Sequence, residues 1–95
     1  MSTTITSLRK IGYARVMRDD PDLQRQRAAF ENAGCNETFE CPAGQRDWSA
    51  LHSAIATLRS GDALLVWSLD DLDMPAYVVQ DLVERHGASV VQLRR

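Results

Sequence analysis

The stretch Ala63-Leu64-Leu65-Val66-Trp67 decides the fold of this chain. It is a run of five apolar residues between Gly61-Asp62 and Ser68, which is a typical length for a strand and too short for a helix. An apolar run without alternation is typical of a strand buried on both faces, as in parallel sheets that carry helices on either side. The stretch therefore predicts an α/β protein built around such a strand.

The sequence on either side of this run supplies the other elements. Three further segments have strand character, and three have apolar residues at helical spacing. The expected strands are 11–16, 37–40 and 89–93, and the expected helices are 23–33 (after Pro21 and before Gly34), 48–58 (before Gly61) and 75–86 (before Gly87). Strands and helices alternate along the chain, which predicts a three-layer sandwich with a mainly parallel sheet and right-handed crossovers.

The 95 residues, 44% of them apolar and 25% charged, suffice for one domain and not for two. We expect residues 1–9 to form an N-terminal tail and residues 10–95 a single domain. Apolar runs stay far below the roughly 18 residues that cross a bilayer, and Met1–Ser7 lacks the basic and apolar parts of a secretory signal. A cytoplasmic protein without membrane contact is therefore expected.

The charge balance and the cysteines exclude further classes of function. Thirteen acids face eleven bases, of which only Lys10 is a lysine, so bulk positive charge does not favour nucleic-acid binding. Cys35 and Cys41 lack the CxxC spacing and the nearby histidines of a zinc site, so we expect two reduced thiols. No metal and no cofactor are predicted. In a parallel sheet a site forms at the carboxyl ends of the strands, here after Val16, Glu40 and Trp67.

Several spaced motifs occur in a recognisable order. They are Ile11-Gly12-Tyr13-Ala14-Arg15-Val16, Leu23, Gln26, Ala33-Gly34-Cys35, Phe39-Glu40, Gly44, Arg59, Gly61-Asp62 and Val66-Trp67-Ser68-Leu69-Asp70. Together they resemble the N-terminal catalytic domain of the resolvase/invertase serine recombinases, from about Lys10 to Arg95. The resemblance implies the resolvase catalytic-domain fold and a place in DNA recombination.

In active members of that family a serine directly after the Tyr-x-Arg-Val segment attacks a DNA phosphodiester and becomes joined to a 5′-phosphate. This chain has Met17 at that position. A thioether has no proton to lose and no anionic form, so it cannot act as the oxygen nucleophile of covalent catalysis. We interpret Met17 as an apolar side chain that fills space.

The second family cluster, Asp-Arg-Leu-Gly-Arg, grips the reacting phosphate with its two arginines. The corresponding stretch here is Asp70-Asp71-Leu72-Asp73-Met74, which keeps the first aspartate and loses both arginines. Asp71 at the first arginine position and Asp73 at the glycine position repel a phosphate instead of stabilising it, and Met74 at the second arginine position carries no charge. The resemblance therefore implies a pseudoenzyme. Ser68 is the nearby hydroxyl that could replace the lost nucleophile.

The residues that remain from the family's pocket are Tyr13, Arg15, Gln26 and Asp70. With Met17, Asp71 and Met74 they make up a vestigial recombinase pocket with no intact catalytic set. We expect Arg15 to form a charge-assisted pair with the neighbouring aspartates. Arg46 lies near where the family places a further arginine, and its role stays open.

A rival interpretation is a receiver-like signalling domain, with Asp19, Asp20 and Asp70 as magnesium ligands. It lacks the lysine that receivers carry near the last strand, and Asp19 and Asp20 are more simply caps of the helix after Pro21. His52 and His86 lie on different expected helices, and we expect both at the surface or at helix ends. Trp48 and Trp67 are expected to anchor the core.

Active family members continue into a long dimer helix and a small helix-turn-helix domain, which we do not expect here. The predicted role is therefore a regulatory remnant that contacts protein, either another copy of itself or a full-length recombinase. DNA would be bound weakly or through that partner. The alternative is residual strand exchange or DNA binding together with a full-length recombinase. A protein surface on the third helix would include Tyr77, Val78, Leu82 and Val83, although core packing explains most of these residues equally well.

Overall fold

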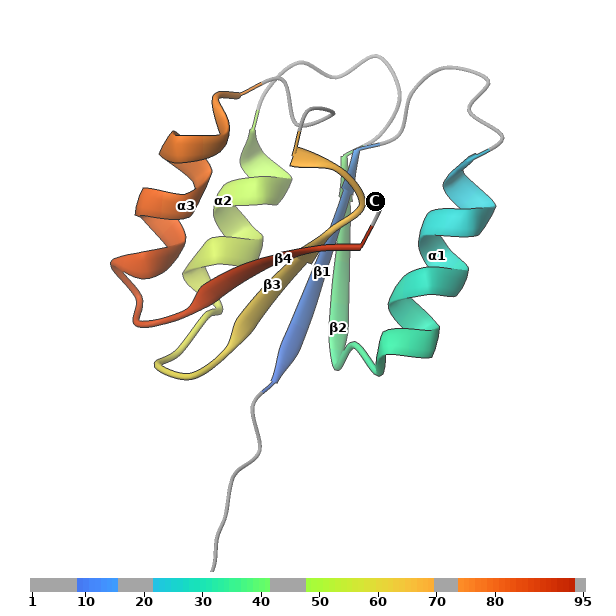
Figure 1. Cartoon of the computed structure of the whole chain (residues 1–95), viewed down its shortest axis with the longest axis horizontal. Coiled ribbons are helices and arrows are strands. Elements are labelled where there is room, and N and C mark those ends of the chain that lie inside the picture. The colour runs from blue at the N-terminus through green and yellow to red at the C-terminus, as the bar shows by residue number, and fades with distance from the viewer. Residues whose placement is uncertain (1–8, 16–21, 42–47, 70–73, 94–95) are drawn as a thin grey trace, which may run out of the picture.

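The computed structural model describes residues 9–15, 22–41, 48–69 and 74–93, and Figure 1 shows its architecture. Strands and helices alternate along the described chain. The elements are β1 (Lys10–Arg15), α1 (Asp22–Ala33), β2 (Glu37–Cys41), α2 (Ser49–Ala56), β3 (Ala63–Val66), α3 (Ala76–Glu84) and β4 (Ser89–Gln92). The predicted order is confirmed, with boundaries that differ by one or two residues; Val16 and the cap candidates Asp19 and Asp20 lie outside the described residues.

The four strands form one sheet in the order β2-β1-β3-β4, and all three strand pairs are parallel. Tyr13 in β1 lies opposite Phe39 in β2 and Val66 in β3, which sets the register at the centre of the sheet. A parallel sheet brings the beginnings of its strands to one edge and their ends to the other. We call these the amino edge and the carboxyl edge.

The helices cover the sheet from both sides, with α2 and α3 on one face and α1 on the other (Figure 1). The larger core cluster lies under α2 and α3 and contains Ile11, Tyr13, Leu64 and Val66, all fully buried. The smaller cluster lies under α1 and contains Ala14, Phe30 and Leu65. Neighbouring residues of β3 thus belong to different clusters, which confirms that this strand is buried on both faces and that the sandwich has three layers.

Two glycines are required by the way the layers pack. A Cβ atom at Gly12 would meet both Phe30 Cγ and Thr38 Cγ2 at 3.1 Å, so the missing side chain lets α1 approach the sheet closely. Gly87 follows α3 with φ +74°, a left-handed conformation that favours glycine, and lies against Ser60 of the preceding loop. The close approach of α1 to β1 and the predicted stop after the third helix have these physical causes.

One prediction about side-chain burial is wrong. Trp48 was expected in the core, but it is 37% exposed, because it is the N-cap residue before α2 and its backbone is not helical. Among the residues named for a protein surface on the third helix, Val83 is fully buried on the side of α3 that faces the sheet, in agreement with the core packing that was the other interpretation. His52 and His86 are exposed, as predicted.

A buried carboxylate ties the amino edge together. Asp62 is 5% exposed, and its Oδ2 accepts hydrogen bonds from Arg9 Nη2 at 3.0 Å and from the Arg59 backbone N–H at 2.8 Å, while Oδ1 accepts from the Arg9 backbone N–H at 3.3 Å. Arg9 also donates through Nη2 to the Thr57 carbonyl. Burial alone raises the pKa of Asp62, but these hydrogen bonds outweigh it and hold the pKa below its ordinary value.

Candidate active site

The carboxyl edge receives its central residues from β1. Tyr13 and Arg15 are two positions apart, so both side chains project to the face that carries α2 and α3. Tyr13 is completely buried within the larger core cluster, whereas Arg15 is half-buried at the last residue of the strand, opposite Cys41. The strand thus holds an aromatic ring in the core and a guanidinium at the rim.

The Tyr13 hydroxyl is buried and makes no hydrogen bond within the described part of the chain. Burial raises the pKa of Tyr13 to about 12; the nearby Cys41 acts in the same direction and the Arg15 charge opposes it. The group is therefore a neutral phenol at physiological pH. A buried polar atom without a hydrogen bond lowers the free energy of unfolding by roughly 1–3 kcal/mol, so the hydroxyl does not stabilise the folded state.

Gln26 lies in another layer of the molecule. It is 3% exposed on α1, the helix that covers the opposite face of the sheet from the Tyr13 side chain. A glutamine buried to this degree takes part in the packing of α1. The structure thus brings Tyr13 and Arg15 together and assigns Gln26 to the other face, a separation that the sequence alone did not predict.

Three of the described residues after β3, Ser68, Leu69 and Met74, are buried or partly buried. Met74 is partly buried against the larger core cluster, at the position where the family pattern has its second arginine. Ser68, considered above as a replacement nucleophile, is 7% exposed. The Leu69 backbone N–H donates to Gln92 Oε1 at 2.9 Å, which ties the loop after β3 to the end of β4. The described side of this loop therefore presents packed side chains.

Three of the seven predicted pocket residues, Met17, Asp70 and Asp71, lie outside the described residues, as does Arg46. The pairing expected between Arg15 and the aspartates accordingly stays a prediction. Within residues 9–15, 22–41, 48–69 and 74–93, no three His, Cys, Asp or Glu side chains gather as a metal site would require. Both cysteines are free thiols. None of the helices in these ranges could span a membrane.

Sequence reasoning missed two interactions that hold the sheet edges. Asp62 belongs to the quoted Gly61-Asp62 motif, but a single aspartate before a strand does not reveal that Arg9 lies beside it 53 residues away. Gln92 was expected only as part of a strand, and its bond to Leu69 depends on the pairing of β3 with β4. Both interactions follow from topology, which becomes visible only when the strand order is known.

The comparisons with known proteins agree with the fold. The family described as "Resolvase, N terminal domain" matches residues 10–94. Serine recombinase gin of Escherichia phage Mu is 44% identical over 64 residues, which are 65% of this chain and 33% of that protein. A DNA-invertase of Enterobacteria phage P7 is 41% identical over 64 residues, 65% of this chain and 34% of that protein, and DNA-invertase hin of Salmonella typhimurium is 36% identical over equal shares.

The chain thus spans about a third of the length of these relatives. The matched range, residues 10–94, contains every strand and helix of the described structure. The all-parallel sheet with helices on both faces is the α/β architecture that the resemblance implied. The chain belongs to the family of resolvase N-terminal domains, within the serine recombinases.

Proposed function

We propose that this chain is a catalytically inactive serine recombinase domain that acts through contacts with other proteins. The observation that carries the proposal is Met17 at the position of the nucleophilic serine. The replacement of both phosphate-gripping arginines by Asp71 and Met74 supports it independently. The relatives named above are recombinases and invertases, so the proposed role concerns DNA recombination without DNA cleavage by this chain.

The chemistry of these positions gives the proposal its physical basis. Strand cleavage needs an oxygen that attacks phosphorus and cations that stabilise the charge on the transferring phosphoryl group. A methionine supplies neither a proton nor an anion at the first position. At the second cluster, an acid stands where a cation is needed, and Met74 packs against the core. Arg15 alone cannot replace this set.

A role in protein contact is consistent with the charge of the chain. The formal net charge of −2 disfavours an independent hold on the phosphate backbone. We propose a cytoplasmic protein that meets either a second copy or a full-length recombinase and binds DNA weakly or through that partner. The retained Tyr13 and Arg15 favour one alternative, residual DNA contact or strand exchange in a mixed assembly with an intact recombinase.

The test is covalent capture of DNA. The purified chain is incubated with duplex DNA carrying recombination sites, with serine recombinase gin as the positive control, and the products are separated on a denaturing gel. We expect no protein–DNA adduct from this chain alone. An adduct would overturn the proposal, and its loss in Ser68→Ala would show that Ser68 had become the nucleophile. An adduct of this chain itself, distinguished by its smaller size from the adduct of gin and formed only in the mixture with gin, would support the alternative.

A second experiment tests the arginine positions. Met17→Ser restores a hydroxyl, yet we expect the variant to form no adduct, because Asp71 and Met74 leave the phosphate without its two cations. Arg15→Ala in the same Met17→Ser background is the matched control and should behave identically. Strand cleavage by Met17→Ser alone would show that the lost arginines do not matter and that a single substitution silences the site.

A further inference from the structure

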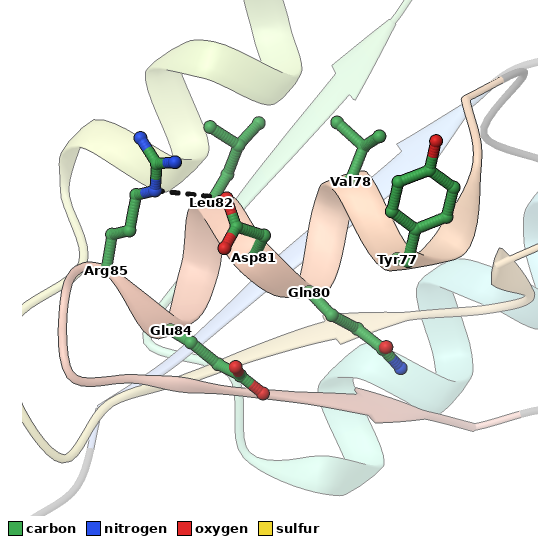
Figure 2. A pocket seen from close by; sticks show the side chains of 7 residues that line it. All are labelled: Tyr77, Val78, Gln80, Asp81, Leu82, Glu84 and Arg85. Atoms are coloured by element: carbon green, nitrogen blue, oxygen red, sulfur yellow. Dashed lines mark ion pairs between the residues drawn. The ribbon is translucent and has the colours of Figure 1, made fainter.

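Helix α3 has one side in the core and an outer side that is exposed to solvent, and Leu82, at the border between them, packs partly against the larger core cluster. Val79 and Val83 are fully buried, whereas Tyr77 is 73% exposed and Val78 and Leu82 are half-buried. A shallow cavity of about 460 Å³ runs along this outer side. It is lined by Tyr77, Val78, Gln80, Asp81, Leu82, Glu84 and Arg85 (Figure 2).

The chemistry of this outer side, which we call the α3 face, changes along the helix. The Tyr77 ring lies at one end of the cavity and the Arg85 guanidinium at the other (Figure 2). Eight residues of helix separate them by about 12 Å. Asp81 lies midway and pairs with Arg85, Oδ2 to Nε, at 3.0 Å. Because this pair uses Nε, the two terminal nitrogens of the guanidinium can reach a further partner.

We propose that the α3 face is the docking surface for a second copy of this chain, with the two α3 helices antiparallel across a two-fold axis near Asp81. The inference rests on the proposed function in one respect, that the domain works through protein contacts, and it names the surface and the occupant. A two-fold axis exchanges the ends of the face, so each Tyr77 ring meets the Arg85 guanidinium of the other copy. A guanidinium over an aromatic ring is a favourable cation–π contact, made twice.

The rest of the face fits the same arrangement. The half-buried Val78 and Leu82 of one copy meet their counterparts and lose their remaining contact with water. Each Asp81 is accompanied by its own Arg85, so the two carboxylates that approach the axis are not bare charges. Antiparallel helices also bring the positive end of one helix dipole to the negative end of the other.

The balance of charge favours a copy over an oppositely charged partner. Asp81 and Arg85 neutralise each other, which leaves Glu84 as the single unbalanced charge among the residues that line the cavity. Such a face has no strong field that would steer a nucleic acid or a basic peptide. Its aromatic end and cationic end are complementary to each other, and a reversed copy offers both in the required positions. A two-fold pairing also closes on itself without forming a filament.

The size of the face sets the expected affinity. A nine-residue helix buries less than the ~1,200–2,000 Å² of a standard interface, so the dimer is weak. We expect a dissociation constant on the order of 10–100 μM and therefore measure the sedimentation of the full chain from 5 to 500 μM, concentrations chosen to bracket it. The average mass should rise from 10.6 kDa towards twice that value. A chain that stays monomeric over this range overturns the inference.

Substitutions decide whether the α3 face carries the association. Arg85→Glu places an acid against the Tyr77 ring and should weaken dimerisation at least tenfold, and Tyr77→Ser should do the same by removing the ring. Glu31→Lys reverses a charge on α1, on the far side of the sheet, and should leave the dissociation constant unchanged. Dimerisation that survives both α3 variants would place the contact elsewhere and overturn the inference.

A disulfide trap tests the two-fold axis directly. In a Cys35→Ser background, Asp81→Cys brings two thiols together at the axis and should give a covalent dimer under mild oxidation, whereas Glu31→Cys should not. Equal yields from both variants would contradict the antiparallel pairing. These outcomes are separate from the DNA assay. If the chain is monomeric and forms no adduct with DNA, only the proposed α3 contact is wrong. If the chain dimerises and forms an adduct, only the proposed inactivity is wrong.

Discussion

The buried polar groups at the two edges of the sheet differ in their hydrogen bonding. At the amino edge, the Asp62 carboxylate accepts three hydrogen bonds from Arg9 and Arg59. At the carboxyl edge, the Tyr13 hydroxyl is equally buried and makes no hydrogen bond within the described residues. The first edge is built for stability, because two of the three hydrogen bonds to Asp62 come from Arg9, which lies 53 residues away in the chain. The carboxyl edge contains a buried hydroxyl that does not stabilise the fold.

The comparison separates polar contacts that the fold needs from polar groups that the fold does not need. A fold needs the amino edge whatever the protein does, since the loop before β3 and the residue before β1 must be held together. For the carboxyl edge the resemblance implies a serine and two arginines, and this chain has Met17, Asp71 and Met74 at those positions. Substitutions at the two edges should therefore have very different effects on the free energy of unfolding.

The largest effect is expected at the amino edge. Asp62→Asn replaces one acceptor oxygen by a donor that faces Arg9 and the Arg59 N–H, and should lower the free energy of unfolding by about 2–4 kcal/mol. Chemical denaturation at pH 7 measures this. The control is Glu37→Gln at the exposed start of β2, which should change stability by no more than about 0.5 kcal/mol.

The same substitution predicts a pH dependence. The pKa of Asp62 is lowered in the folded state, so the unfolded state takes up the proton first as the pH falls. The stability that Asp62 contributes is complete above its unfolded value near 3.8 and is lost as the pH falls through the folded value. Asp62→Asn should remove this part of the acid sensitivity. Identical acid profiles for both proteins would show that Asp62 is not the responsible group.

An intermediate effect is expected where the carboxyl edge does hold a bond. Gln92→Met removes the acceptor of the Leu69 N–H and should cost about 0.5–1.5 kcal/mol. Amide hydrogen exchange at Leu69 should become faster, while exchange in β1 stays slow. The control Ser89→Ala, at the exposed start of β4, should leave exchange at Leu69 unchanged. Unchanged exchange in Gln92→Met would show that another contact secures the loop.

The smallest effect at neutral pH is expected for Tyr13→Phe. It removes a buried hydroxyl without a described hydrogen bond and should leave stability unchanged or raise it by up to about 1 kcal/mol. A loss of more than about 1 kcal/mol would show that this hydroxyl is as well bonded as Asp62 and would end the contrast between the edges.

Stability measured at alkaline pH should distinguish Tyr13→Phe from the unsubstituted protein more clearly than stability at neutral pH. The pKa of Tyr13 is raised from 10.0 to about 12, so the folded state retains its proton when the unfolded state has lost it. The stability due to the neutral phenol is complete below pH 10 and falls by about 2–3 kcal/mol as the pH rises to 12. Tyr13→Phe should lack this loss in denaturation curves recorded from pH 9 to 12.

Much of the fold could be predicted because its signals are local. The run Ala63–Trp67 indicates a doubly buried strand without any knowledge of its neighbours, and Gly34 and Gly87 stop helices through their own conformation. The burial of Trp48 could not be predicted in this way. A tryptophan at apolar spacing looks the same whether it opens the helix or lies just before it, and only the backbone decides.

The candidate site was less accessible to sequence reasoning. The groups that the resemblance implies and this chain lacks could be named from single positions, since a thioether supplies no oxygen to attack phosphorus in any fold. Where the remaining groups lie depends on the layers: Tyr13 and Gln26 are both expected pocket residues, yet α1 carries Gln26 on the face opposite the Tyr13 ring. Partnerships such as Arg9 with Asp62 depend on strand order and leave no trace in a short motif.

The packing of Met74 has an evolutionary consequence. The resemblance implies an arginine at this position, whereas Met74 lies against the apolar core. Met74→Arg would remove apolar contacts and bring a guanidinium to a place that is packed around a thioether. Under the proposed inactivity, this single change would lower stability and would restore activity only together with changes at Met17 and Asp71. The packing of Met74 would then disfavour a stepwise return to an active site.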